Sequence, residues 1–432
     1  MNKLLKNDGT QKLVASVISI ILGLIFGSIL VLIVGAASAV IDGKGAWEGV
    51  KLIFAGLFST GRSPEGVLTW GVNSVNFGNM LFRAIPLIMC GLSVAISQKT
   101  GLFNIGAPGQ YLMGMLVTLL LALSIPTTVV PPTLVWLIAF LGGILAGALW
   151  GAIPGLMKAM LNINEVIACI MTNWIAANVV TWVFDIANFS VVKGEYFCQN
   201  KWHTATGLFQ NLAENTKSGY VYKTVWNNVA TPKLGLDKIF PGSQINAGIV
   251  IAIIFAIAMY IIINKTTFGF QLKACGANRH AARYAGIKDK KNIVLSMSIA
   301  GGLAAAGAAL YSLSGNTEFF WTTYQSLPAI GFNGIPVALL AINNPIGVIF
   351  SGIFMAMLDI VGVQLTKLTA YNEYITDVII AAIVYLSAFA LIIRMFLSGG
   401  NKKKAAVVAD TKPAEEPKPT EDAKIEEGGE QA

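Results

Sequence analysis

Charged residues are scarce in this chain. Asp, Glu, Lys and Arg make up 12% of its 432 residues, 55% of the residues are hydrophobic, and the mean hydropathy is +0.67. An ordinary soluble domain is about 25% charged. So little charge excludes a water-soluble globular protein, and so much apolar surface excludes a chain that is disordered throughout. The composition indicates a protein that crosses a membrane several times.

Histidine and cysteine are also rare. The chain has two histidines, and its four cysteines are widely spaced: Cys90, Cys169, Cys198 and Cys275. We therefore expect neither a metal site nor a disulfide framework. A glycine-rich phosphate loop is absent, because Gly43-Lys44 is followed by Gly45 and not by Ser or Thr. The hydrolase motifs HExxH and Gly-x-Ser-x-Gly are absent too, so we predict no catalytic residues and no enzyme.

Long apolar runs, by contrast, are numerous. A helix needs about 20 mostly apolar residues to cross a bilayer. Ten stretches meet this requirement: 13–41, 78–97, 102–124, 130–157, 163–186, 246–263, 293–314, 325–342, 346–365 and 375–397. The stretch 325–342 is the weakest, since it contains two prolines, and it either crosses or re-enters. We predict an all-α polytopic membrane protein with about ten transmembrane helices and with broken or re-entrant segments near 101–110 and 325–342.

The basic residues indicate the orientation. With the N-terminus in the cytoplasm, most lysines and arginines of the short loops lie inside, as the positive-inside rule requires. An even number of crossings places the C-terminus inside as well. Membrane topology thus accounts for the net charge of +8, and no nucleic-acid partner is expected.

The chain divides into a membrane part and its extensions. We predict a cytoplasmic N-terminus at 1–12 and a transmembrane domain at 13–397. An external insert at 187–245 is rich in aromatic residues, which suggests an ordered cap. Residues 398–432 are rich in charge and proline, which predicts a disordered cytoplasmic tail.

Two ionisable residues lie well inside the predicted spans. Arg83 and Asp359 both fall in the outer half of the membrane. We expect them to face the protein interior and to interact near the external mouth, because a lone charge there is costly. The alternative is that Arg83 reaches the outer surface alone. A proton-driven or sodium-driven carrier usually has more such groups, which favours transport powered from elsewhere.

The longest cytoplasmic connection, 264–292, is strongly basic. Asn278 follows a Gly-Ala break and is placed to cap a short helix that carries Arg279 and Arg283 on one side. A loop held at the lipid headgroups would explain the charge but not the helix-break-helix pattern. We therefore predict a docking role for this loop.

Two interruptions of the hydrophobic pattern resemble each other. One is GLFNIGAPGQ at 101–110 and the other is GFNGIP at 331–336, and both contain Phe-Asn followed by Gly and Pro. Paired interruptions in the two halves of a transporter point to a substrate site. The alternative is that these glycines and prolines serve helix packing and loop turns.

Several stretches together resemble a known family. They are GLFNIGAPGQ (101–110), NEVIACIMTNWIA (164–176), FGFQLKACGANRHAARYAGI (268–287) and LPAIGFNGIPVALLAINNPIGV (327–348). Over roughly residues 75–395 the chain resembles permease subunits of bacterial ABC importers in the branched-chain amino acid/ribose permease superfamily, specifically the nucleoside branch. It departs from that family at Pro108, where an acidic residue is usual, and at Asn333, where Asp is usual.

The resemblance implies partners and a mechanism. The chain would lie in the bacterial cell membrane with a second homologous permease, a cytoplasmic ABC ATPase and an external substrate-binding lipoprotein. It would carry nucleosides by alternating access, and ATP would be bound by the partner, so no cofactor is expected in this chain. A ribose- or galactose-type sugar permease and a self-sufficient secondary carrier are the alternatives.

The resemblance also implies roles for named residues. Asn104, Gln110, Asn173 and Asn333 would line the substrate pathway with Phe332 beside them, because amides can bond the ribose hydroxyls and base edges of a nucleoside. The alternative is that each amide bonds a neighbouring helix. Gly276, Arg279 and Arg283 would couple the membrane part to the ATPase.

Overall fold

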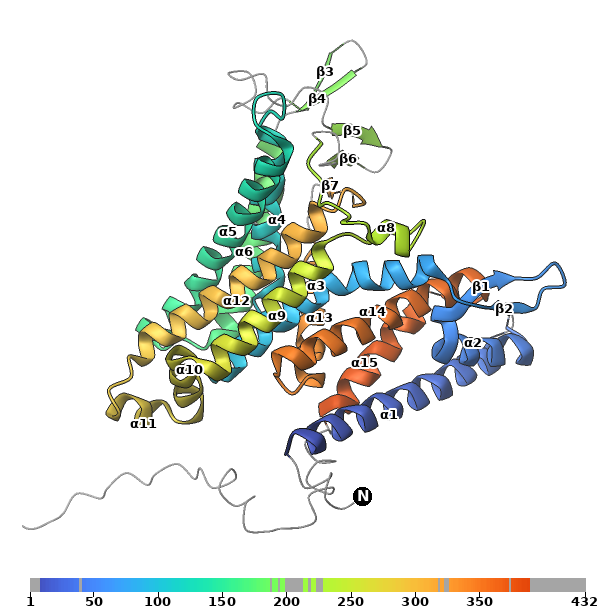
Figure 1. The fold of residues 1–432 in the computed structure, drawn as a ribbon, viewed down its shortest axis with the longest axis horizontal. Helices are drawn as coiled ribbons and strands as arrows, with labels where there is room; N and C mark the ends of the chain where they lie inside the picture. The colour runs from blue at the N-terminus through green and yellow to red at the C-terminus, as the bar shows by residue number, and fades with distance from the viewer. Residues whose placement is uncertain are drawn as a thin grey trace, which may run out of the picture.

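The computed structural model describes residues 8–38, 41–186, 189–192, 195–198, 213–216, 219–222, 228–317, 319–321, 326–372 and 374–388. Helices dominate this described part (Figure 1). Eight of them are long and apolar enough to cross a membrane: α1 (Asp8–Ala37), α3 (Ser74–Lys99), α4 (Ala107–Ser124), α5 (Pro132–Leu161), α6 (Glu165–Ile186), α9 (Gly248–Lys265), α12 (Asp289–Ser312) and α14 (Pro345–Leu368). The predicted all-α polytopic fold is confirmed.

Helix α3 lies at the centre of the described part. In its most apolar 18-residue window 89% of the residues are buried, against 33% in the corresponding windows of α5 and α9. α14 runs antiparallel to it, since Gln364 Nε2 donates to Asn76 Oδ1 (3.0 Å) near one end and Gly352 packs on Ile88 near the other. α12 is antiparallel to α3 as well. Phe82 stacks on Tyr311, and Thr100 Oγ1 donates to Ser296 Oγ (2.7 Å).

The segment between α12 and α14 leads from one end of the bundle back to the other. Both helices are antiparallel to α3, so α12 ends on the side opposite to the start of α14. The return path contains α13 (Ala329–Leu340), whose 12 residues rise only about 18 Å. Crossing or re-entry of 325–342 stays a prediction, because α13 alone is too short to span a bilayer. The last predicted span corresponds to α15 (Tyr374–Ala388), and residues 389–397 lie outside the described part.

Close packing of α5 on α12 rests on small residues. Glycines at 143, 147, 151 and 155 form a stripe along α5, spaced four residues apart. A Cβ atom on Gly147 would lie 2.2 Å from Ala305 Cβ, and one on Gly151 would lie 2.4 Å from Met297 O. Small residues let two membrane helices approach until their backbones touch. This packing holds the α4–α5–α6 side of the molecule against the centre.

A second group of helices packs on the other side of the centre. α1 runs beside α15 in Figure 1, and Tyr371 Oη donates to Val31 O (2.7 Å) just before α15 begins. The chain after α1 includes a helix that the scan for apolar spans did not predict. Residues Gly43–Ala55 form helix α2, capped by Asp42 Oδ1, which accepts from Gly45 N (2.6 Å). α2 buries Leu52 and Ile53 against the core, a pattern hidden by its short length.

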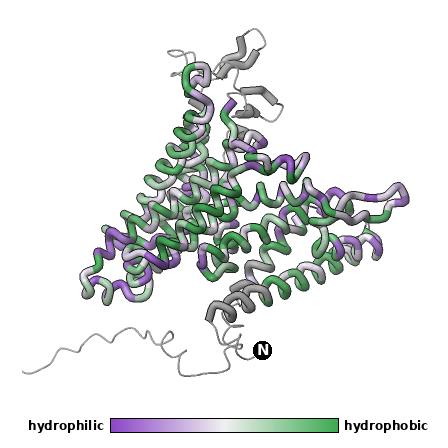
Figure 2. Tube along the Cα trace, viewed as in Figure 1, coloured by the Kyte–Doolittle hydropathy of each residue, from purple (hydrophilic) through white to green (hydrophobic). Residues whose placement is uncertain are grey.

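Short strands and polar helices lie at the two ends of the bundle. Figure 2 shows hydrophobic colour along the long helices and polar colour at their ends. The strands are β1 (Ser59–Arg62), β2 (Leu68–Trp70), β3 (Phe189–Val192), β4 (Glu195–Cys198), β5 (Ala213–Thr216), β6 (Gly219–Tyr222) and β7 (Phe319–Trp321). They pair antiparallel as β1–β2, β3–β4 and β5–β6–β7. The short helices are α8 (Leu236–Ile239), α10 (Thr267–Ala277) and α11 (Arg279–Tyr284).

Parts of the predicted domain scheme fall outside the described residues. These parts are residues 1–7, most of 187–227 and the whole tail 398–432. The described strands of the insert include a sheet that joins it to the segment after α12, because β6 pairs with β7.

The α5–α12 contact gives a matched pair of variants. Gly301→Ala should destabilise the protein by about 1–3 kcal/mol, because the new methyl group would lie 2.1 Å from Gly147 O. Gly302→Ala is the control, since there the nearest atoms lie at 3.5 Å, an ordinary contact distance. Thermal unfolding in detergent measures both. Equal midpoints for the two variants would contradict the packing described.

Candidate functional site

The first interruption is a non-helical turn between α3 and α4. Gly101 has a positive φ of 74°, a conformation that favours glycine. A Cβ atom there would lie 3.2 Å from Gly276 Cα, and one on Gly276 would lie 2.4 Å from Lys99 O. Gly276 therefore touches the end of α3 and the start of the interruption, backbone against backbone. The loop 264–292 and the first interruption are in direct contact.

Buried amides hold this turn. Asn104 and Gln110 pair reciprocally: Asn104 Nδ2 donates to Gln110 Oε1 (2.8 Å) and Gln110 Nε2 donates to Asn104 Oδ1 (3.1 Å). Asn173 of α6 accepts from Gly109 N and donates to Ile105 O, both at 2.9 Å. These bonds satisfy backbone groups that an intact helix would have paired.

The three amides do not face open space in this conformation. The exposed fraction is 0% for Asn104, 1% for Gln110 and 2% for Asn173. Their contacts are those of the alternative reading, in which amides bond neighbouring segments. Lining of the pathway by these residues stays a prediction that requires the turn to open.

The second interruption meets the first. In α13, a Cβ atom on Gly331 would lie 2.5 Å from Pro108 Cα, and one on Gly334 would lie 2.6 Å from the carbonyl carbon of Cys90. The other side of this helix carries Phe332, which is 37% exposed, and Asn333, which is half-buried. Of the five predicted pathway residues, these two have accessible side chains.

The predicted coupling helix exists and is capped as expected. Asn278 Oδ1 accepts from Ala281 N (3.0 Å) at the start of α11. Both arginines, however, bond within the chain: Arg279 Nε donates to Asp289 Oδ2 (2.7 Å) and Arg283 Nη2 donates to the same oxygen (2.8 Å). This hydrogen bond raises the pKa of the Arg283 guanidinium. The arginines thus position α11 against the start of α12.

A residue that the sequence reasoning passed over is the most exposed aromatic of this loop. Tyr284, at the end of α11, is 95% exposed, while Ala282 beside it is buried. Tyrosine is enriched at protein interfaces, so this exposed ring is a candidate contact for a partner protein. Its position among small and basic residues was the only signal in the sequence.

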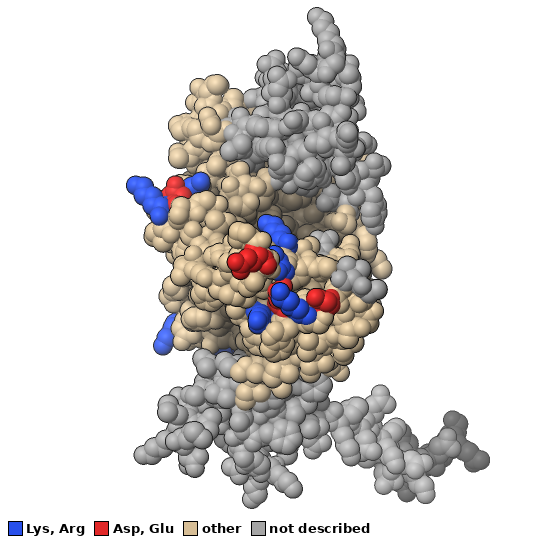
Figure 3. All heavy atoms as spheres, turned by 90° about the vertical axis from the view of Figure 1, so that its right-hand side faces the viewer, with Lys and Arg blue, Asp and Glu red and all other residues tan. Residues whose placement is uncertain are grey.

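Arg83 and Asp359 lie together as predicted. Arg83 Nη1 is 3.3 Å from Asp359 Oδ2, and the two side chains are 38% and 42% exposed. They line an open cavity of about 360 Å³ together with Thr366, Lys367, Tyr374 and Asp377. Figure 3 shows acidic and basic side chains gathered on this face of the molecule.

A second ion pair on the same side of the molecule was not predicted. Arg62 of β1 bonds Glu48 of α2 (2.6 Å) and donates from Nε to Leu368 O at the end of α14 (2.9 Å). Glu48 is only 7% exposed, so this bond is largely shielded from solvent. It fastens the β1–β2 hairpin to α2 and α14. This ion pair could not be predicted from the sequence, because Glu48 and Arg62 both lie between two predicted spans.

The pairing of Arg83 with Asp359 can be tested by a double-mutant cycle. Arg83→Ala and Asp359→Ala should each destabilise the protein, and their coupling energy should fall within about 0.5–3 kcal/mol, because either charge alone lacks its partner. Lys158→Ala combined with Asp359→Ala is the control, since Lys158 pairs with Glu165 (2.9 Å). Thermal unfolding measures each variant. Additive effects for the first pair would rule out the interaction.

Comparison with known proteins places these features in a family. Residues 76–388 match the model of the family described as branched-chain amino acid transport system / permease component. The chain is 32% identical over 403 residues to the nucleoside ABC transporter permease protein NupB of Lactococcus lactis, covering 93% of this chain and 97% of NupB. It is also 32% identical over 396 residues to the guanosine ABC transporter permease protein NupP of Bacillus subtilis, covering 91% and 98%.

A further relative comes from one of the same organisms. The nucleoside ABC transporter permease protein NupC of Lactococcus lactis is 24% identical over 292 residues, or 66% of this chain and 82% of NupC. Two different permeases of one bacterium are thus similar to this chain. No solved structure matches. The chain therefore belongs to the family of ABC transporter permeases described as the permease component of branched-chain amino acid transport systems.

Proposed function

We propose that this chain is the permease subunit of an importer that carries nucleosides across a bacterial cell membrane. The observation that carries the proposal is the similarity to NupB and NupP, which extends over more than nine tenths of the chain. The names of those proteins specify nucleoside and guanosine. A family match alone would leave the cargo open, because the family description refers to branched-chain amino acids.

In this proposal the energy comes from a separate cytoplasmic ATPase, which binds the ATP. The chain lacks a phosphate loop of its own. A second, homologous permease and an external substrate-binding lipoprotein complete the transporter. The existence of two related permeases in Lactococcus lactis supports the pairing of homologous chains. Both termini of the chain would face the cytoplasm, in agreement with its basic residues.

The ATPase would dock on α10 and α11. Tyr284 offers an exposed aromatic contact, and Arg279 and Arg283 hold α11 in place through Asp289. Movement of this loop would reach the membrane part through Gly276, which touches the turn between α3 and α4. That turn contains the first interruption, so a small displacement of the loop acts directly on it.

The substrate would pass beside Phe332 and Asn333. Opening of the pathway would separate the two interruptions, which touch at Gly331 and Pro108. Separation would expose the amides of Asn104, Gln110 and Asn173 one after another. Amides suit a neutral nucleoside because each both donates and accepts hydrogen bonds. The pair of Arg83 and Asp359 would act near the external mouth as a structural element, since a neutral cargo needs no counter-ion.

Uptake measurements test the proposal. The chain is reconstituted with the ATPase, second permease and binding protein from its own gene neighbourhood, and entry of radiolabelled guanosine, uridine, ribose and galactose is followed. We expect ATP-dependent uptake of a nucleoside that unlabelled ribose does not inhibit. Uptake of a sugar alone would favour the sugar permease, and uptake without the ATPase would favour a secondary carrier.

If the ATPase docks at α11, removal of the Tyr284 side chain should weaken binding of the ATPase. Tyr284→Ala should reduce co-purification of the ATPase about tenfold and lower uptake in parallel. Thermal stability should not change, because a side chain 95% exposed contributes almost no internal packing. Trp70→Ala is the control: Trp70 is 42% exposed on β2, far from α11 in Figure 1, and should leave co-purification intact. Unchanged ATPase binding by the Tyr284 variant would contradict the docking surface.

Opening of the interruptions predicts different accessibility at two positions. An Asn333→Cys variant should react with a water-soluble thiol reagent in the resting transporter, whereas Asn104→Cys should react only while ATP is hydrolysed. The native Cys90, Cys169 and Cys275 are buried, and Cys198 is replaced by Ser to remove background. Protection of both introduced cysteines in every state would show that these segments do not line the pathway.

A further inference from the structure

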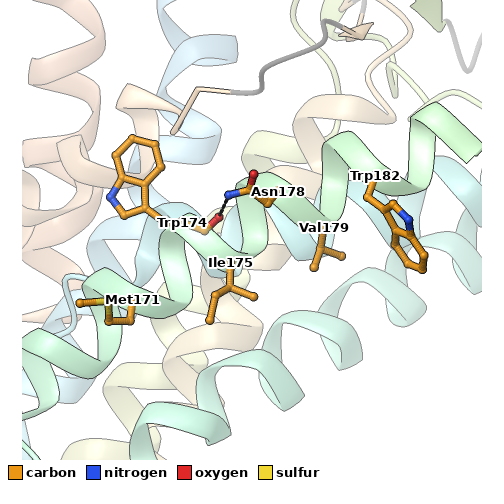
Figure 4. A pocket seen from close by; sticks show the side chains of 6 residues that line it. All are labelled: Met171, Trp174, Ile175, Asn178, Val179 and Trp182. Atoms are coloured by element: carbon orange, nitrogen blue, oxygen red, sulfur yellow. Dashed lines mark hydrogen bonds between the residues drawn. The ribbon is translucent and has the colours of Figure 1, made fainter.

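One outward face of α6 differs in chemistry from the outward faces of α5 and α9. In the middle of α5 and α9 the exposed large side chains are aliphatic, for example Leu141, Leu145, Leu149, Ile254 and Ile257. Such side chains suit contact with lipid tails. The face of α6 instead carries Met171, Trp174, Asn178 and Trp182, which line a shallow cavity of about 440 Å³ together with Ile175 and Val179 (Figure 4).

The depth of these residues argues against contact with lipid. Trp174 lies nine residues after the start of α6 and Asn178 thirteen, which places them about 14 Å and 20 Å along a helix that spans a core of about 30 Å. Tryptophan that faces lipid concentrates at the membrane surfaces and not near the centre. The side chain of Trp174 is nevertheless 44% exposed.

The amide of Asn178 strengthens the argument. Its Nδ2 donates to Trp174 O (2.8 Å), and among the described residues its Oδ1 has no hydrogen-bond partner. Asn178 is exposed, so that oxygen would face hydrocarbon if lipid covered α6. An unpaired carbonyl oxygen in hydrocarbon is costly. A polar partner for this oxygen, from water, from the cargo or from a neighbouring subunit, would remove that cost.

We propose that Trp174, Asn178 and Trp182 form a wall of the transport pathway that contacts the nucleobase of the cargo. The proposal rests on the proposed function. Figure 4 shows Asn178 between the two indole rings along α6. A planar base stacks on an exposed indole, and the Asn178 oxygen accepts from a base N–H group. The hollow is shallow and its six lining residues all belong to α6, so it supplies one side of a binding site.

This wall also changes the role of α6 in the pathway. Asn173, one residue before Trp174, points inward to the turn before α4. Trp174 and Asn178 lie on the opposite, accessible side of the same helix. The helix thus fixes the interruption with one side and offers a base-binding surface with the other.

Thiol labelling of the complete transporter in proteoliposomes tests whether the face is wet. In a Cys198→Ser background, an Asn178→Cys variant should react with a water-soluble thiol reagent at least tenfold faster than Leu145→Cys, which is the lipid-facing control. Leu145 is 61% exposed on α5. Equal rates would overturn the proposal. A spontaneous disulfide from Asn178→Cys to the second permease would assign the face to subunit contact and would also overturn it.

Transport kinetics test the contact with the base. Trp174→Leu should raise the KM for nucleoside uptake about fivefold, whereas Trp174→Phe, which keeps an aromatic face, should stay within twofold of the native protein. Equal KM values for Trp174→Leu and the native chain would overturn the proposal. The labelling experiment needs no nucleoside, so its result does not depend on the proposed function. Failure of the proposed function would appear separately, as absent nucleoside uptake by the native chain.

Discussion

A helix that is broken at membrane depth must find hydrogen-bond partners inside the protein. In this permease the partners of the first interruption are three amides, and Asn173 of a different helix supplies bonds on both sides of the turn. The second interruption packs against the first without a side chain between them, since Gly331 lies on Pro108. The arrangement of α3, α4, α6 and α13 depends on this contact between the two interruptions, in which the amides provide the hydrogen bonds.

The same junction lies next to the end of the bundle that carries α10 and α11. Gly276 of α10 touches the backbone from Lys99 to Gly101, so the loop that faces the cytoplasm in our proposal abuts the first interruption. The ion pairs of Asp289 hold α11 to α12, which crosses beside α3 and packs tightly on α5. The molecule therefore contains a short physical connection between a proposed docking helix and a proposed pathway. Glycine contacts, not long side chains, make that connection.

Hydropathy alone predicted most of the crossings, because membrane burial demands long apolar runs. The pairing of Arg83 and Asp359 was also predictable, since two charges at similar depth have few other partners. The orientation of the amides was not predictable, because a sequence does not say whether Asn173 or its neighbour Trp174 turns outward. Helix α2 and the ion pair of Arg62 were missed, since a 13-residue amphipathic helix resembles a loop in a scan for spans. The bonds of Arg279 and Arg283 to Asp289 depend on the angle between α11 and α12, which spacing does not define.

We propose that the junction of the two interruptions opens when the partner hydrolyses ATP. The distance between spin labels at Phe332 on α13 and Met171 on α6 measures this directly, because both side chains are exposed. We expect a single distance without nucleotide and a second, longer distance during ATP turnover in the complete transporter. One unchanged distance while ATP is hydrolysed and substrate is carried would contradict it.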